Sequence, residues 1–338
     1  MKSRLLYPTA LAALLSLVLI AAAPGPQYHY EGAQSFFDRI ARPATTTDIT
    51  LMMDVDGLLA NKYSAEDFPA TIRSGGENFP VEVSVRGRYR RRVCDFPPLK
   101  LKFNKDMLEA AGLERHSKFK LVTHCSDSFD SDDNLLREKM AYDLYALLTG
   151  EGYRTQLVNI TYIDDDSDYQ IQRLGIIIED TDEMAEHLGG EECDECFGLQ
   201  PEQFIPGNLE AFTLFQYLIG NTDWSVNLQR NLKIVTMPNG AYKAVPYDFD
   251  FAGLVNAEYA VPNPDLDQQE VKDRVWQGQF GASEQLDATA SQILAQQETV
   301  MAFVDQYPGM SNRSKRQIKQ YLASGFEAIA TGEVASAL

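Results

Sequence analysis

The segment 212–250 constrains the fold most, because signals for helix, turn and strand alternate closely there. The apolar run Phe212–Ile219 predicts a helix, and Gly220 predicts its end. A short apolar strand at 232–235 and a second strand are separated by a Pro-Asn-Gly turn. The segment therefore predicts a helix followed by a β-hairpin.

Acidic and amide side chains stand at the ends of these elements. Asp223 follows the helix, and Asn231 opens the hairpin. Asp248 and Asp250 close the hairpin. An Asp can orient an acceptor hydroxyl, while an Asn and a later Asp hold Mg²⁺ on phosphates, so this order is typical of phosphoryl transfer. We expect Asp223 to orient the acceptor and the later residues to bind the metal, with Asn227 as an alternative ligand.

The same residues could also have purely structural roles. Asp223 is placed where an Asp often caps a turn, and Asp250 could close a turn or pair with an arginine. For Asp248, between the apolar residues Val245 and Phe249, function is favoured because an unpaired carboxylate in such surroundings is costly.

Composition defines a globular chain and excludes one class of partner. The 338 residues are 44% hydrophobic and 23% charged, enough for one large domain or two lobes. The formal net charge of −19 argues against nucleic-acid binding, which needs a basic surface. Against this acidic background, arginines crowd into segment 86–92. This patch is either a phosphate-binding site or an exposed strand end.

Residues 1–23 are typical of an export signal. Basic residues precede an apolar run that ends in Ala21-x-Ala23, and no other stretch could span a membrane. Pro24 disfavours cleavage at that point, so an uncleaved N-terminal anchor is the alternative. We expect an exported protein, periplasmic or extracellular, with no membrane span beyond this possible anchor.

Four cysteines in an exported chain indicate disulfides. We expect Cys94 to pair with Cys125. Cys193 and Cys196 have the CxxC spacing of a redox or zinc site, but their acidic neighbours disfavour a reactive thiolate. The sequence has no second CxxC motif, so a short-loop disulfide is favoured over a metal site.

The order of the predicted elements divides the chain. We expect residues 24–46 to form an extension with one short helix. Strand patterns dominate 47–180, interrupted by a strong helix at 134–148, whereas helices dominate 181–338 apart from the hairpin. We therefore expect a β-rich N-terminal lobe, a mostly helical C-terminal lobe and a cleft between them.

Four segments, taken in order, resemble the CotH-type (spore-coat protein H-like) kinases, a divergent branch of the protein-kinase-like fold with secreted members. They are Val85–Arg88 with the strand Leu99–Phe103, the helix Leu136–Tyr142, the strand Gly175–Asp180, and Asp223-Trp224 with Pro246–Asp250. The match spans roughly residues 45–255. The resemblance implies an α+β, two-lobed protein-kinase-like fold. The sequence has no GxGxxG loop, so arginine and lysine would hold the phosphates.

The resemblance also implies roles in nucleotide binding. Arg86 and Arg88 would clamp a phosphate, because a guanidinium can donate two parallel hydrogen bonds. Lys100 or Lys102, which share one side of a strand, would contact the phosphates of the nucleotide. Glu138 would orient that lysine through an ion pair.

The implied function is an exported phosphotransferase. Glu179, at the junction of the lobes, would lie beside the base of the nucleotide through its backbone, and a solvent-facing position is the alternative. The cofactors would be Mg²⁺ and ATP, or a related phosphate donor, and the acceptor a protein Ser/Thr or another hydroxyl-bearing molecule. One alternative is a catalytically inactive binding or scaffold protein of the cell envelope. A second is a hydrolase that acts through the same carboxylates.

Overall fold

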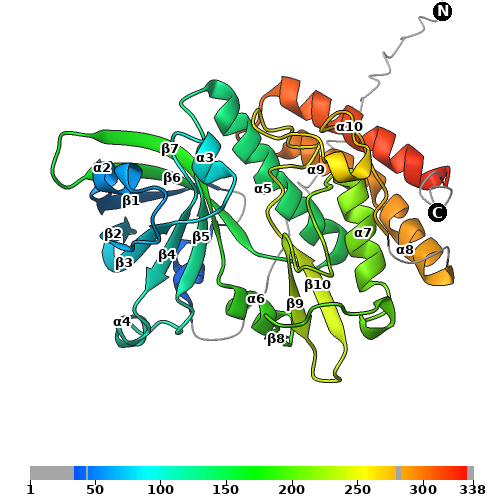
Figure 1. The fold of residues 1–338 in the computed structure, drawn as a ribbon, viewed down its shortest axis with the longest axis horizontal. Coiled ribbons are helices and arrows are strands. Elements are labelled where there is room, and N and C mark those ends of the chain that lie inside the picture. Colours follow the sequence, from blue (N-terminus) through cyan, green and yellow to red (C-terminus); the bar gives the residue numbers. More distant parts are fainter. Residues whose placement is uncertain (1–33, 43–44, 279–282, 333–338) are drawn as a thin grey trace, which may run out of the picture.

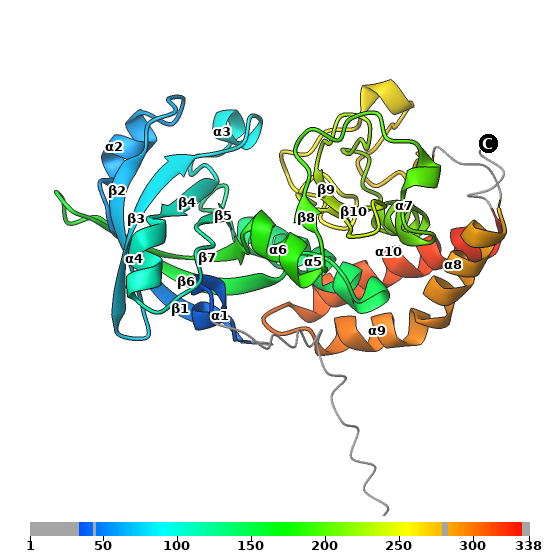
Figure 2. The same cartoon turned by 90° about the horizontal axis from the view of Figure 1, so that it is seen from below.

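The computed structural model describes residues 34–42, 45–278 and 283–332. Figure 1 shows a strand-rich part and a helix-rich part, with the long helix α5 (Phe129–Thr149) between them. Figure 2 gives the same arrangement from a second direction. The helix α5 is therefore the element that both parts share.

Seven strands of the N-terminal part close into a barrel in the order β1-β2-β3-β4-β5-β7-β6. The strands are β1 (Thr47–Met53), β2 (Phe68–Ser74), β3 (Glu77–Val85), β4 (Leu99–Phe103), β5 (Lys118–Val122), β6 (Thr155–Asp164) and β7 (Gln170–Ile178). Neighbours in this order pair antiparallel, except β1 and β6. These two pair in parallel, with Thr47 opposite Val158, and their pairing closes the barrel.

The predicted fold class, an α+β, two-lobed protein-kinase-like fold, is wrong, because the strands form a closed barrel. Strand β2 was not predicted, although it pairs with both β1 and β3. The parallel pairing of β1 with β6 joins segments that are far apart in the sequence. Periodicity reports which residues of a strand are buried but not which strand lies beside it, so closure was not visible in the sequence.

The short helix α1 (Phe36–Ile40) fills part of the barrel core. Ser35 caps this helix, and the Asp38 side chain accepts a hydrogen bond from the Ser35 backbone in return. The ring of Phe36 is fully buried, with its centroid 4.4 Å from that of Phe103 and 5.3 Å from that of Phe119. The hydrophobic effect on this aromatic group therefore ties the start of the described chain to the barrel.

The helix-rich part contains a second, three-stranded sheet. Its helices are α6 (Thr181–His187), α7 (Asn208–Ile219), α8 (Glu284–Ala295), α9 (Gln297–Gln306) and α10 (Asn312–Ala330), and its strands are β8 (Glu191–Glu192), β9 (Leu232–Thr236) and β10 (Tyr242–Pro246). The predicted helix and hairpin are thus α7 and β9–β10. Gly220 ends α7 with φ 64°, a left-handed conformation that glycine adopts without strain.

The other elements are short. They are α2 (Val55–Ala60), α3 (Arg90–Val93), α4 (Lys105–Ala110) and the 3-10 turns at Pro201–Gln203 and Pro264–Leu266.

Both predicted disulfides are confirmed. Cys94 pairs with Cys125, and Cys193 pairs with Cys196. Two disulfides are typical of proteins in an oxidising compartment. The predicted export signal at 1–23 lies outside the described residues. Within 34–42, 45–278 and 283–332, no helix has both the length and the apolar character needed to cross a membrane.

We expect the substitution Phe36→Ala to lower the free energy of unfolding by about 3–5 kcal/mol, because it leaves a cavity in the barrel core. Denaturant unfolding followed by circular dichroism measures this change. Phe197→Ala is the matched control, since the Phe197 side chain is 60% exposed, and it should shift stability by less than about 0.5 kcal/mol. Equal effects of the two substitutions would contradict the packing of α1 described above.

Candidate functional site

Asp223 and Asn231 are bonded to each other across the loop that follows α7. The Nδ2 atom of Asn231 donates to the backbone oxygen of Asp223 at 2.7 Å and to its Oδ2 atom at 2.9 Å. Asn231 has φ 56°, a left-handed conformation that Asn tolerates better than most residues. These bonds use the amide nitrogen, so Oδ1 is the atom with which Asn231 could bind a metal.

Asp248 is held by its backbone at the end of the hairpin. Its φ of 66° is left-handed, and its backbone N–H donates to the hydroxyl of Tyr142 at 2.8 Å. Tyr142 belongs to α5, and its ring packs against that of Phe249 with centroids 4.7 Å apart. The carboxylate of Asp248 is therefore placed by helix α5 as well as by its own hairpin.

Asp250 is the most buried carboxylate of the hairpin. It is 4% exposed, and its Oδ2 atom accepts a hydrogen bond from the Tyr259 hydroxyl at 3.1 Å. Burial, and after it the charge of Asp248, raise the pKa of Asp250, while Arg90 lowers it, and the net result is a pKa of about 7. The carboxyl of Asp250 therefore binds a proton more readily than an ordinary Asp does.

The charges of the predicted carboxylates affect one another's pKa values. Burial is the largest cause that raises the pKa of Asp223, and the charge of Asp248 raises it too. Arg230 acts in the other direction, since its Nε atom lies 3.4 Å from Oδ1 of Asp223. Burial likewise raises the pKa of Glu138, followed by the charge of Asp250. The structure therefore brings these four acidic residues, three of them from the C-terminal part, close enough to repel one another.

The available oxygen ligands suit Mg²⁺ better than they suit a metal ion that is bound by protein side chains alone. Among the described residues, no group of three or more His, Cys, Asp or Glu side chains could hold a metal ion. Mg²⁺ does not require such a group, because it binds one or two carboxylates, substrate phosphates and water. Asp248, Asp250 and Oδ1 of Asn231 offer hard oxygen ligands of this kind. Asn227 is exposed in the loop before Asn231.

Lys120 lies beside Tyr247, the residue directly before Asp248, and was not predicted. Its Nζ atom donates to the Thr181 hydroxyl at 2.9 Å and lies 5.0 Å and 5.3 Å from the ring centroids of Tyr153 and Tyr247. Burial, and after it the charge of Arg86, lower the pKa of Lys120 to about 7. The alternation in β5 marks Lys120 as outward-facing, but no sequence signal shows that two tyrosine rings cover it.

The two predicted lysines of β4 lie on the outer face of the barrel. Lys100 pairs across the sheet with Lys120, so it stands beside the covered lysine. Lys102 lies further along the strand, where its Nζ atom is 2.7 Å from Glu82 and 3.6 Å from Asp67 in exposed ion pairs. Exposed pairs of this kind contribute little to stability. Lys102 is therefore engaged in surface ion pairs with Glu82 and Asp67, whereas Lys100 lies near the candidate site because it stands beside Lys120.

The remaining predicted residues are divided between the site and the core. Arg86 is half-buried, and its charge lowers the pKa values of both Lys120 and Glu138. Arg88 is exposed. Glu179 is fully buried, and its Oε2 atom lies 2.6 Å from Nε of Arg154. The structure therefore places Arg86 beside the site and uses the Glu179 side chain in a buried ion pair.

No known family model matches this chain, and no curated protein is detectably similar to it in sequence. A solved structure that is similar is the crystal structure of a Helicobacter pylori proinflammatory kinase, CtkA. The alignment covers 71% of this chain and 94% of that chain, with 11% sequence identity and a TM-score of 0.39. A likeness this distant identifies neither a family nor a function. The resemblance to CotH-type kinases therefore stays a prediction.

We expect Lys120 to react with an amine-acylating reagent half-maximally near pH 7, because only the neutral amine is a nucleophile and burial lowers its pKa to about 7. Trace labelling between pH 6 and pH 11, roughly the range spanned by lysine pKa values in proteins, followed by mass spectrometry, measures the profile. Lys102 is the internal control, since Glu82 raises its pKa above the ordinary value. If Lys120 and Lys102 titrate together, the cover of tyrosine rings over Lys120 is wrong.

Proposed function

We propose that this chain is an exported phosphotransferase that moves a phosphoryl group from Mg²⁺-ATP, or a related donor, to a hydroxyl acceptor. The observation that carries the proposal is the convergence of Asp223, Asn231 and Asp248. Two hydrogen bonds join Asn231 to Asp223, and the charge of Asp248 raises the pKa of Asp223. Phosphoryl transfer needs this combination of an acceptor-orienting Asp and metal-binding oxygens.

Asp223 is the residue that would orient the acceptor. Its side chain is half-buried, and the bond from Asn231 to Oδ2 fixes the direction of the carboxylate. Burial raises its pKa toward the range in which a base accepts a proton effectively near neutral pH. The second oxygen, Oδ1, faces Arg230 at 3.4 Å, an exposed contact that an incoming hydroxyl can displace.

A bound metal ion and two nearby cationic side chains would neutralise the negative charge of the phosphate donor. Asn231, Asp248 and Asp250 would hold Mg²⁺, which when bound supplies positive charge to the phosphates. Lys120 and Arg86 lie near each other, since the charge of Arg86 lowers the pKa of Lys120. A polyphosphate bound there would draw a proton onto Lys120, because an adjacent anion raises the pKa of an amine.

The compartment and the acceptor belong to the same proposal. Two disulfides and the export signal expected at 1–23 support a periplasmic or extracellular protein, with the N-terminus as a possible anchor. The acceptor would then be an exported protein or another hydroxyl-bearing molecule of that compartment. A net charge of −19 disfavours nucleic acid as the partner.

We expect Asp248→Asn to incorporate at least about 100-fold less labelled phosphate from Mg²⁺-ATP than the unchanged protein, because it removes a metal-binding carboxylate. Asn tolerates the left-handed φ of 66° at this position, so the backbone stays intact. Asp267→Asn is the matched control, since Asp267 also has a left-handed φ, 52°, and is exposed to solvent. It should leave incorporation unchanged.

Equal incorporation by the Asp248→Asn and Asp267→Asn proteins would refute the catalytic role of Asp248. Calorimetry with Mg²⁺-ATP then separates the alternatives. Nucleotide binding without transfer would favour an inactive binding or scaffold protein. Release of free phosphate without an acceptor would favour a hydrolase.

A further inference from the structure

Arg90 belongs to the basic segment 86–92, but it is buried. The residue is 8% exposed, and its Nη2 atom donates to the backbone oxygen of Thr123 at 2.6 Å. Its Nη1 atom lies 3.9 Å from Oε2 of Glu138 on α5. The guanidinium carbon lies 5.5 Å from the ring centroid of Tyr259. Arg90 is therefore a fixed internal cation rather than a solvated end of a strand.

The contacts of Arg90 lead to the hairpin carboxylates. Tyr259, over whose ring Arg90 stacks, donates its hydroxyl hydrogen to Asp250. Tyr89, the residue before Arg90, donates its own hydroxyl hydrogen to the backbone oxygen of Tyr259 at 3.0 Å. Arg90 thus stands between Glu138 on one side and the Tyr259–Asp250 pair on the other.

A small cavity of about 30 Å³ adjoins Arg90 and Glu138. That volume is enough for a water molecule. Arg90 Nε and Glu138 Oε1 are both buried and have no hydrogen-bond partner among the described residues. A water in this cavity would satisfy a donor and an acceptor that otherwise cost free energy. A bound water could therefore join Arg90 to Glu138 in addition to their direct ion pair.

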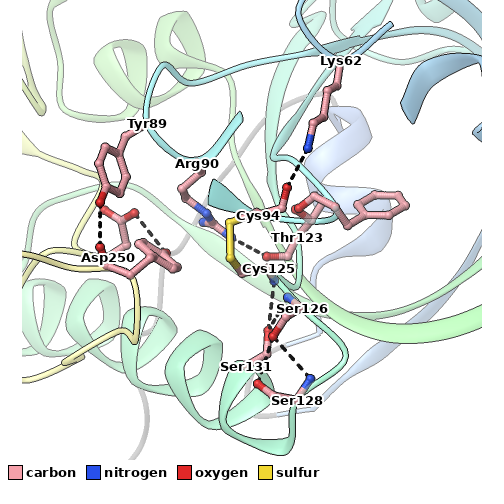
Figure 3. The surroundings of a disulfide bond; sticks show 12 residues. Lys62, Tyr89, Arg90, Cys94, Thr123, Cys125, Ser126, Ser128, Ser131 and Asp250 are labelled. Carbon is pink, nitrogen blue, oxygen red and sulfur yellow. Dashed lines mark hydrogen bonds between the residues drawn. A yellow bond between two sulfur atoms is a disulfide. The ribbon is translucent and has the colours of Figure 1, made fainter. Parts of the chain in front are cut away.

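The Cys94–Cys125 disulfide holds the helix that carries Arg90. Cys94 directly follows α3, and its backbone N–H donates to the oxygen of Arg90. Cys125 follows β5, and its backbone N–H donates to the Ser131 hydroxyl of α5 at 2.9 Å. Figure 3 shows Arg90 beside this disulfide, with Asp250 and Tyr89 nearby. The disulfide therefore ties α3 to the start of α5.

Helix α3 is held in part by this disulfide. It has four residues, and no side chain caps its N-terminus. A helix of one turn forms a single hydrogen-bonded nucleus, which is unfavourable in water without tertiary support. Opening the disulfide would leave Arg90 and its backbone held only by hydrogen bonds such as those of Arg90 to Thr123 and of Asp95 to Cys125, so this segment would open more often.

We propose that Arg90 is a positioning residue of the phosphotransfer site, and that the Cys94–Cys125 disulfide keeps it in place. The inference rests on the proposed function. Arg90 acts through Glu138 and through Tyr259, which holds Asp250, and it does not touch the phosphates. Reduction by a dithiol would break the sulfur–sulfur bond, give two cysteine thiols and convert the dithiol to its own disulfide, with two electrons and two protons transferred.

The first experiment replaces the charge of Arg90. Arg90→Met keeps most of the volume and removes the cation, so we expect kcat for phosphate transfer to fall about 100-fold with the KM for the acceptor unchanged. Arg90→Lys should recover part of kcat, because it restores a cation. Arg115→Met is the matched control, since Arg115 forms exposed ion pairs with Asp106 and Glu109, and it should behave as the unchanged protein. An unaltered kcat in Arg90→Met, or no recovery in Arg90→Lys, would overturn the inference.

The second experiment opens one disulfide at a time in the full chain. The pair Cys94→Ser and Cys125→Ser should speed hydrogen exchange of the amides at 90–94 and lower kcat as Arg90→Met does. The pair Cys193→Ser and Cys196→Ser is the control. It should leave both the hydrogen exchange at 90–94 and kcat unchanged. Equal exchange at 90–94 in the two double variants would refute the tether. This arm needs no activity and stays decisive should Arg90→Met fail to fold.

The two proposals fail in different ways. An unchanged protein that transfers no phosphate would end the proposed function, and exchange at 90–94 would still decide whether the disulfide holds Arg90. Transfer by the unchanged protein with an equal rate in Arg90→Met would leave the function standing and remove the role of Arg90.

Discussion

The hydrogen bond from the Asp248 backbone to the Tyr142 hydroxyl is the contact on which the site depends. It joins the C-terminal hairpin to α5, the helix that lies between the barrel and the other helices (Figure 1). Tyr142 is buried, so its hydroxyl would lose free energy without a partner, and the same bond fixes the left-handed turn at Asp248. Glu138 lies one helical turn before Tyr142 on α5, which brings Arg90 into the same region.

Local signals predicted local structure well. The stop at Gly220, the Pro-Asn-Gly turn and the alternation around it placed α7 and the hairpin β9–β10 close to where they lie. The pairing of Cys94 with Cys125 was also expected and is present. Each of these features depends on neighbouring residues or on scarce, specific side chains, which a sequence displays directly.

Non-local packing was not predictable in the same way. The barrel closes through β1 and β6, and nothing in either strand names its partner. Lys120 differs from ordinary strand lysines only because Tyr153 and Tyr247 fold over it from distant segments. Arg90 looked like one of several surface arginines until burial against Glu138 distinguished it. The carboxylates of the candidate site and the nearby Arg86 were named from the sequence, whereas Lys120 and the buried position of Arg90 became visible only in the fold.

The separation of β1 and β6 has a consequence for the life of the chain. Asp48 and Asn159, which face each other across these strands, are 111 residues apart in the sequence. Because the ribosome synthesises a chain from its N-terminus, β1 is made well before β6. Until β6 is made, the backbone groups on that edge of β1 lack their partners. Unpaired strand edges recruit other chains, and pairings across long loops form slowly. Until β6 has been synthesised and has paired, the β1 edge is therefore a place where newly made copies can associate with other chains.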